Sequence, residues 1–267
     1  MAFCGRTILA FAALCGVAAA AAPAGASGVE VDVELVLAVD TSNSMAADEQ
    51  TIQRAGYVEA IASTEVIAAI EVGLIGRIAV SYLEWGEAGR ETVVVDWHVI
   101  EDRESAEIFA EKLAAAPIGQ RRRTSISGAL TFAADMIETN DFEGLRKVID
   151  VSGDGPNNHG GPVLEAREAT LRRGIVVNGL PVMIDDGRRR WSVVQELDVY
   201  YETCVIGGPS AFLIPVRSKA DFAHAIRRKL VLEIAGLAPD TYRLIPASAR
   251  GGPEEICTAG ERSAALR

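Results

Sequence analysis

One apolar stretch that ends in oxygen-bearing side chains constrains this chain more than any other feature. Residues 33–39 (VELVLAV) are almost all apolar, and the sequence Asp-Thr-Ser-Asn-Ser follows at once at residues 40–44. A short run this apolar is typical of a strand covered on both faces, as in the middle of a parallel sheet. Ligands of open α/β sheets bind at the carboxyl ends of the strands, so we expect a binding site directly after Val39.

The pattern Asp-x-Ser-x-Ser, formed by Asp40, Ser42 and Ser44, offers one carboxylate and two hydroxyls. Magnesium prefers an octahedron of oxygen ligands at about 2.0–2.1 Å and often keeps water. A tight turn would direct both hydroxyls to one point while Asp40 supplies charge, but further oxygen ligands would be needed. The same residues are also typical of a loop and a helix N-cap, so the motif alone leaves both interpretations open.

The overall composition is that of a globular protein, with 49% hydrophobic and 24% charged residues among 267. This length is enough for one sizeable domain or two small ones. The formal net charge of −11 disfavours binding to nucleic acid or to anionic membrane surfaces.

The N-terminus has the pattern of a targeting segment. Arg6 provides a short positive region, residues 8–22 are apolar and rich in Ala, and Ala24-Gly25-Ala26 matches an A-x-A cleavage site. The apolar run of about 15 residues is shorter than the roughly 20 that a membrane-spanning helix needs. We therefore expect a signal peptide over residues 1–26, a periplasmic or extracellular location, and no stable membrane insertion after cleavage.

Cys204 and Cys257 are the cysteines that remain after such cleavage. An even pair in an oxidising compartment predicts a disulfide, with two free thiols as the alternative. The closed loop of roughly 54 residues corresponds to about 4 kcal/mol in the chain-entropy model. The bridge would hold a C-terminal tail, residues 237–267, against the body of the protein.

Apolar periodicity predicts a strand, a helix, a hairpin, and then alternating helices and strands. Strands are expected at residues 33–39, 78–85, 91–100, 146–152, 175–180 and 211–216, and helices at 48–71, 105–115, 124–139, 163–173, 191–201 and 218–234. This order predicts an α/β fold of three layers: a doubly wound, mostly parallel six-stranded sheet with one antiparallel edge strand. We expect one domain over residues 27–236, followed by a mobile tail.

Two more oxygen donors are expected near the first motif. Thr124 opens a predicted helix, and Asp154 follows the fourth predicted strand. At these residues the chain resembles the von Willebrand factor type A domain family, whose metal-ion-dependent adhesion site combines Asp-x-Ser-x-Ser, a Thr on a middle loop and an Asp after the fourth strand. Together with the signal peptide and the run GIVVNGLPV at residues 174–182, the chain is similar to an uncharacterised family of secreted bacterial proteins of this fold.

The resemblance implies the fold over residues 31–234 and a bound Mg²⁺, or Mn²⁺ or Ca²⁺. Ser42, Ser44 and Thr124 would be its hydroxyl ligands, with charge from Asp40 and Asp154. One coordination position would stay open for the carboxylate of a partner protein, so the implied function is non-enzymatic binding by a secreted protein. The expected rim of this site comprises Arg121, Arg122, Arg123 and Asn157.

Two other functions stay open from the sequence. A magnesium-dependent phosphoryl hydrolase would use an aspartyl nucleophile, but such enzymes resemble Asp-x-Asp, and Ser42 occupies the position of the general acid. A structural envelope protein with a non-functional metal site is the other. Asp185-Asp186 would be either a second cation site or a solvated acidic turn, and the histidines share no spacing typical of zinc ligands.

Overall fold

The computed structural model describes Met1 and residues 28–184, 196–239 and 253–265. The expected signal peptide after Met1 and the Asp185-Asp186 pair therefore lie outside the described residues. The strands of the sheet are β1 (Val29–Asp40), β2 (Ile78–Trp85), β3 (Thr92–Ile100), β4 (Phe142–Gly153) and β5 (Val176–Pro181). They form one five-stranded sheet in the order β3-β2-β1-β4-β5, in which only the β2–β3 pair is antiparallel. The predicted mostly parallel sheet with one antiparallel edge strand is confirmed.

The predicted count of six strands is wrong for the described residues. Residues 211–216 lie beside β5 but form only isolated bridges, at Gly179–Leu213 and Val182–Val216. Backbone hydrogen bonds join Ile214 to Gly179 and Val216 to Pro181, each from N–H to carbonyl. Pro181 has no N–H, so the next rung of the ladder cannot form and a continuous strand is not made.

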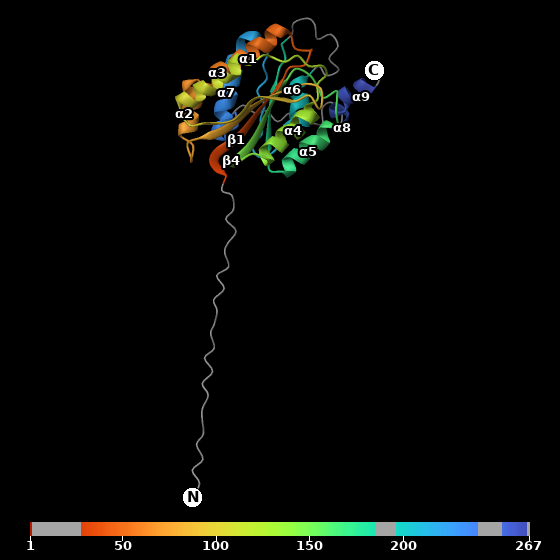
Figure 1. Cartoon of the computed structure of the whole chain (residues 1–267). Coiled ribbons are helices and arrows are strands. Elements are labelled where there is room, and N and C mark those ends of the chain that lie inside the picture. The colour runs from red at the N-terminus through yellow and green to blue at the C-terminus, as the bar shows by residue number, and fades with distance from the viewer. Residues whose placement is uncertain (2–27, 185–195, 240–252, 266–267) are drawn as a thin grey trace.

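Helices cover both faces of the sheet, as Figure 1 shows. One face packs against α1 (Ala47–Ile61), α2 (Thr64–Glu71), α3 (Arg103–Ala115) and α7 (Phe222–Ala235). The other packs against α4 (Ile126–Glu138) and α5 (Val163–Arg172). The remaining helical segments are α6 (Leu197–Tyr200), the π-helix η1 (Tyr201–Val205), the 3₁₀ turn η2 (Lys219–Asp221), α8 (Pro253–Cys257) and α9 (Ala259–Ala265). This is the predicted three-layer sandwich.

Strand β1 is the centre of both apolar cores. Leu35 and Leu37 point into the core beneath α1 and α7, whereas Val36 and Ala38 point into the core beneath α4. Successive side chains of a strand face opposite sides, so a strand in the middle layer is apolar on both faces, and residues 35–39 are. Full burial of each large side chain contributes about 1.5–3 kcal/mol. The apolar run over residues 35–39 is therefore the reason that this segment occupies the centre of the sheet.

The predicted long helix over residues 48–71 is divided into α1 and α2. Ser63 is the N-cap of α2, and its hydroxyl accepts a hydrogen bond from the Val66 N–H at 3.3 Å. A serine that caps the following turn satisfies a backbone donor that a continuous helix would have used, so a second helix begins there. Within the described part of the chain, every helix is too short or too polar to span a lipid bilayer.

A buried ion cluster joins α7 to the sheet. The Lys229 ammonium lies 2.7 Å from Asp150 Oδ1 of β4 and also contacts the Glu233 carboxylate. The Asn178 side chain of β5 donates to Glu233 Oε1 at 2.9 Å. Burial, together with the charge of Asp150, raises the pKa of Glu233 to about 7. Two carboxylates thus share one ammonium in the apolar interior.

Candidate metal centre

The candidate ligands meet at the carboxyl ends of two neighbouring strands. β1 and β4 are parallel, and their register pairs Val39 with Ser152. The next residues along the two strands are Asp40 and Gly153, and Asp154 follows at once. Parallel pairing of β1 and β4 therefore brings two carboxylates together that are 114 positions apart in the sequence (154 − 40).

The residues after Asp40 form a tight turn held by their own side chains. Asp40 Oδ1 accepts a hydrogen bond from the Ser42 N–H at 2.7 Å. The hydroxyls of Ser42 and Ser44 lie 2.8 Å apart, and Ser44 donates to Asp154 Oδ1 at 2.6 Å. The structure thus brings four of the five predicted site residues into one hydrogen-bonded group. Ser44 is exposed, so the group opens to solvent on that side.

Thr124 reaches the same place from the loop that precedes α4. Its backbone N–H donates to Asn158 Oδ1 at 2.9 Å, and its carbonyl accepts from the Asn158 N–H at 2.8 Å. A Cβ added at Gly155 would lie 3.9 Å from Thr124 Oγ1, so this hydroxyl lies beside the residue that follows Asp154. The sequence analysis did not identify Asn158 as a site residue. The available signal was its position four residues after the candidate ligand Asp154.

Asp40 has an electrostatic environment that suits a cation. It is fully buried, and its Oδ2 has no hydrogen-bond partner in the described residues. Burial, followed by the negative charge of Asp154, raises the pKa of Asp40 well above its ordinary value. A buried carboxylate with a free oxygen beside a second carboxylate is stabilised in its ionised form by a neighbouring positive charge.

Tyr201 of η1 lies against the same carboxylate and was not foreseen from the sequence. A Cβ added at Gly153 would lie 2.8 Å from the Tyr201 hydroxyl and 3.1 Å from Asp40 Oδ2. That hydroxyl is likewise buried without a hydrogen-bond partner among the described residues. Two buried oxygens at one point that lack partners among residues 28–184, 196–239 and 253–265, with three hydroxyls nearby, fit a hard cation such as Mg²⁺ and its bound water.

The candidate ligand set contains only two acidic side chains and neither His nor Cys. No group of three or more His, Cys, Asp or Glu side chains that could hold a metal occurs among the described residues. The predicted site instead combines two carboxylates with three hydroxyls. Such an oxygen set favours Mg²⁺ or Mn²⁺ over softer metals.

The predicted role of Arg121 at the rim is wrong. Its side chain is only 12% exposed, and its guanidinium lies 3.0 Å from Glu84 Oε2 and donates to Thr41 Oγ1 at 2.8 Å. These contacts hold the loop before Thr124 against the end of β2, so Arg121 cannot turn toward a partner without breaking them. Arg122 and Arg123 are exposed, as a rim requires.

Asn157 is also not a rim residue, because its side chain is fully buried. Its Oδ1 accepts from the Ser127 N–H at 3.1 Å, and its Nδ2 donates to the Gly161 carbonyl at 3.0 Å. Its backbone N–H donates to the Tyr200 hydroxyl at 3.1 Å. Asn157 therefore fixes the loop that follows Asp154 instead of facing a partner.

The predicted Cys204–Cys257 disulfide is formed, with the two Cα atoms 5.4 Å apart. The expectation of a mobile tail is wrong for its described end, since α8 and α9 pack onto the domain. Glu261 of α9 accepts hydrogen bonds from Asn157 Nδ2 at 3.0 Å and from the Val163 N–H at 2.8 Å. No sequence pattern pointed to Glu261.

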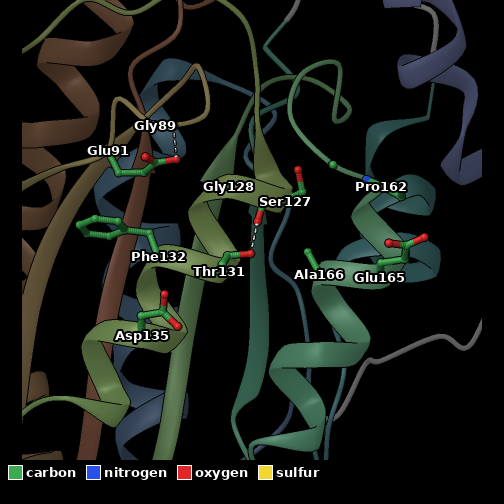
Figure 2. A pocket seen from close by; sticks show the side chains of 11 residues that line it. Gly89, Glu91, Ser127, Gly128, Thr131, Phe132, Asp135, Pro162, Glu165 and Ala166 are labelled. Atoms are coloured by element: carbon green, nitrogen blue, oxygen red, sulfur yellow. Dashed lines mark hydrogen bonds between the residues drawn. The ribbon is translucent and has the colours of Figure 1, made fainter.

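A groove of about 510 Å³ lies between α4 and α5. Figure 2 shows Glu91, Asp135 and Glu165 around it, together with Phe132 on α4. None of the five predicted metal ligands lines it. Its carboxylates would repel an acidic group, so the groove and the candidate metal centre would attract groups of opposite charge.

Comparison with known proteins places the chain in a family and a fold. A family model described as "Protein of unknown function (DUF1194)" matches residues 30–238. No curated protein matches the chain. The solved structures that match share little sequence identity with this chain, so they show similarity of fold alone.

Three of these structures illustrate the fold. Proximal thread matrix protein 1 from the mussel byssus, with a zinc-occupied MIDAS motif, is 14% identical with a TM-score of 0.55, over 78% of this chain and 49% of that one. A von Willebrand factor type A protein from Catenulispora acidiphila is 16% identical with a TM-score of 0.52, and the match covers 77% of this chain and 43% of that one. The pilus adhesin SpaC from Lactobacillus rhamnosus GG is 13% identical with a TM-score of 0.56, and the match covers 77% of this chain and 30% of that one. The match thus spans half or less of each of these longer chains.

Proposed function

Because the chain belongs to the DUF1194 family and has the fold of a von Willebrand factor type A domain, we propose that it is a metal-dependent binding protein. The divalent cation, Mg²⁺ or Mn²⁺, would be held by the hydroxyls of Ser42, Ser44 and Thr124, with charge from Asp40 and Asp154. The observation that carries this proposal is the buried Oδ2 of Asp40, which has no hydrogen-bond partner in the described part of the chain and lies beside the hydrogen-bonded Ser42–Ser44–Asp154 group.

The partner would be a protein that offers a carboxylate. A bound divalent cation with an open coordination position attracts a carboxylate, because hard cations prefer anionic oxygen ligands. Ser44 is exposed, which leaves the centre accessible from solvent. Arg122 and Arg123 are exposed on the neighbouring loop and would attract the same negative charge. The mussel protein, which has a similar fold, has a zinc-occupied MIDAS motif, and this supports the binding of a divalent cation.

We further propose that the protein is exported and is not an enzyme. The expected signal peptide and the Cys204–Cys257 disulfide support an oxidising compartment. The general-acid position of an aspartyl phosphatase is occupied by Ser42, whose hydroxyl is hydrogen-bonded to Ser44. A phosphatase panel in Mg²⁺ is expected to show no turnover above that of an Asp40→Ala variant.

Metal binding is tested by isothermal titration of the chelator-treated chain with Mn²⁺. Wild type is expected to bind one ion per chain, and Asp40→Ala is expected to lose this binding. Asp141→Ala is the matched control, because Asp141 is an exposed aspartate that precedes the first residue of β4, whereas Asp154 follows its last residue. Absence of Mn²⁺ and Mg²⁺ binding by wild type would refute the proposal.

The choice of a carboxylate is tested by water proton relaxation of the Mn²⁺-loaded chain. A short glutamate-containing peptide should displace Mn²⁺-bound water and lower the relaxation enhancement, whereas its glutamine counterpart should not. Equal effects of the two peptides would contradict recognition of an acidic group.

A further inference from the structure

The described end of the C-terminal tail, residues 253–265, packs onto the loop that carries Asp154. We name it the C-terminal segment. Its α8 ends at Cys257, which is bonded to Cys204 of η1, and both cysteines are buried. The disulfide therefore places α9 next to the start of α5. Figure 1 shows α8 and α9 on the side of the molecule where α5 lies.

Glu261 is the polar anchor of the C-terminal segment. Its Oε1 accepts one hydrogen bond from the Val163 N–H and one from Asn157 Nδ2. Val163 is the first residue of α5, and Pro162 before it provides no side-chain cap. A carboxylate at this position satisfies an otherwise unpaired helix N–H and is favoured by the helix dipole. The cap of α5 thus comes from a residue 98 positions away.

The anchored loop connects directly to two of the candidate ligands. Asn157 lies three residues after Asp154 and accepts a hydrogen bond from Ser127 in the first turn of α4. Asn158 makes both backbone contacts of Thr124. The position of this loop therefore determines how far Thr124 lies from Asp154.

Close packing adds to these hydrogen bonds. Gly260 lies against the same loop, and a Cβ there would be 2.3 Å from the Asn157 carbonyl oxygen. Only glycine allows this approach of the two backbones. The C-terminal segment is fitted to the loop both by shape and by the Glu261 carboxylate.

We propose that the C-terminal segment is a disulfide-tethered clamp that sets the geometry of the metal centre, with Glu261 as its positioning residue. The inference rests on the proposed function for its metal-binding consequence. Glu261 accepts hydrogen bonds from Asn157 and Val163, and it acts through Asn157 and the Asn158–Thr124 pair. Loss of the carboxylate frees the loop, so Thr124 and Asp154 are no longer held at a fixed separation, and cation affinity falls.

The first test compares Mn²⁺ affinity in full-length variants. Glu261→Ala is expected to bind Mn²⁺ about 10-fold more weakly, the lower end of the loss typical for residues that orient metal ligands. Glu261→Gln keeps an acceptor oxygen and is expected to recover part of the affinity. Glu255→Ala is the matched control, since Glu255 is an exposed glutamate of the same segment. Wild-type affinity in Glu261→Ala would overturn the clamp.

The second test needs no metal and separates the clamp from the proposed function. Amide hydrogen exchange of the metal-free chain is expected to be faster in Glu261→Ala over residues 124–128 and 155–163, and unchanged in Glu255→Ala. Unchanged exchange in Glu261→Ala would overturn the clamp, even if wild type binds Mn²⁺. A wild type that binds no Mn²⁺ would instead refute the proposed function, and the exchange result alone would then decide whether the clamp exists.

Discussion

Asp40 combines two properties that rarely occur together without a ligand. Its carboxylate is fully buried at the end of the central strand, and one of its oxygens has no hydrogen-bond partner in the described residues. An ionised carboxylate in such a place costs several kcal/mol unless a positive charge compensates it. The residue is thus unfavourable for the stability of the metal-free protein and favourable for binding a cation.

Asp40→Asn is expected to separate these two effects. The amide carries no charge, so the metal-free variant should be at least as stable as wild type at neutral pH. Its Mn²⁺ binding should be lost, and with it the stabilisation that Mn²⁺ gives to wild type. Urea unfolding with and without Mn²⁺ measures both. A metal-free variant much less stable than wild type would contradict the burial argument.

Glu233 predicts a pH dependence of stability in the acidic range. Its pKa is raised to about 7 in the folded protein by burial and by Asp150. Between its ordinary pKa and 7 the folded state keeps a proton that the unfolded state has lost. Its contribution to stability is therefore complete below pH 4.5 and is lost as the pH rises toward 7, by at most about 1.4 kcal/mol per pH unit.

Urea unfolding across this range checks the expectation. Glu233→Gln should remove this part of the slope, because glutamine does not titrate. Glu143→Gln is the control, as Glu143 of β4 is exposed. Identical pH profiles for wild type and Glu233→Gln would show that Glu233 titrates normally in the folded protein.

At the scale of elements, the loop that precedes Thr124 has a strained backbone. Arg123 immediately precedes Thr124 and has a φ of 59°, in the left-handed region that side chains other than glycine rarely adopt. Arg121 and its contacts hold one end of this loop, and the Thr124–Asn158 pair holds the other. Two fixed ends force an unfavourable backbone conformation between them.

Arg123→Gly is expected to stabilise the protein by up to about 1 kcal/mol, because a left-handed conformation costs roughly 1–2 kcal/mol for other residues and glycine loses more entropy on folding. Arg122→Gly is the matched control, since Arg122 is also exposed and is not among the described residues with positive φ. It should destabilise or leave stability unchanged. Thermal unfolding compares the two, and equal shifts would show that Arg123 is not strained.

At the scale of the whole molecule, the C-terminal segment completes a domain whose metal centre lies at one end of the sheet. The Cys204–Cys257 bridge joins residues 53 positions apart. Cross-linking over such a distance stabilises mainly by restricting the unfolded chain, by about 4 kcal/mol in the entropy model.

The double variant Cys204→Ser/Cys257→Ser is therefore expected to unfold at lower urea, with a loss of stability on the order of 4 kcal/mol. A reducing agent should destabilise wild type in the same direction and leave the double variant unchanged, which controls for other effects of the reagent. Equal stability of wild type and variant would contradict a stabilising role of the bridge.

Much of the fold and of the candidate site followed from local patterns. The apolar run of β1 and the spacing of Asp40, Ser42 and Ser44 are properties of neighbouring residues, and parallel pairing then brings Asp154 to them. The rim was less predictable. Arg121 had the charge expected of a rim residue, but Glu84 neutralises it from another strand.

The sequence by itself determined the central strand, the order of the layers and the chemical class of the candidate ligands. These depend on side-chain polarity at a period of two or 3.6 residues and on which residue types carry oxygen. Only the tertiary structure decided that Asn157 is buried, that residues 211–216 form no full strand, and that Glu261 caps α5 across 98 positions. Such contacts depend on how distant segments pack. Two hydrogen-bonding groups far apart in a chain leave no periodic pattern in the sequence that would predict their contact.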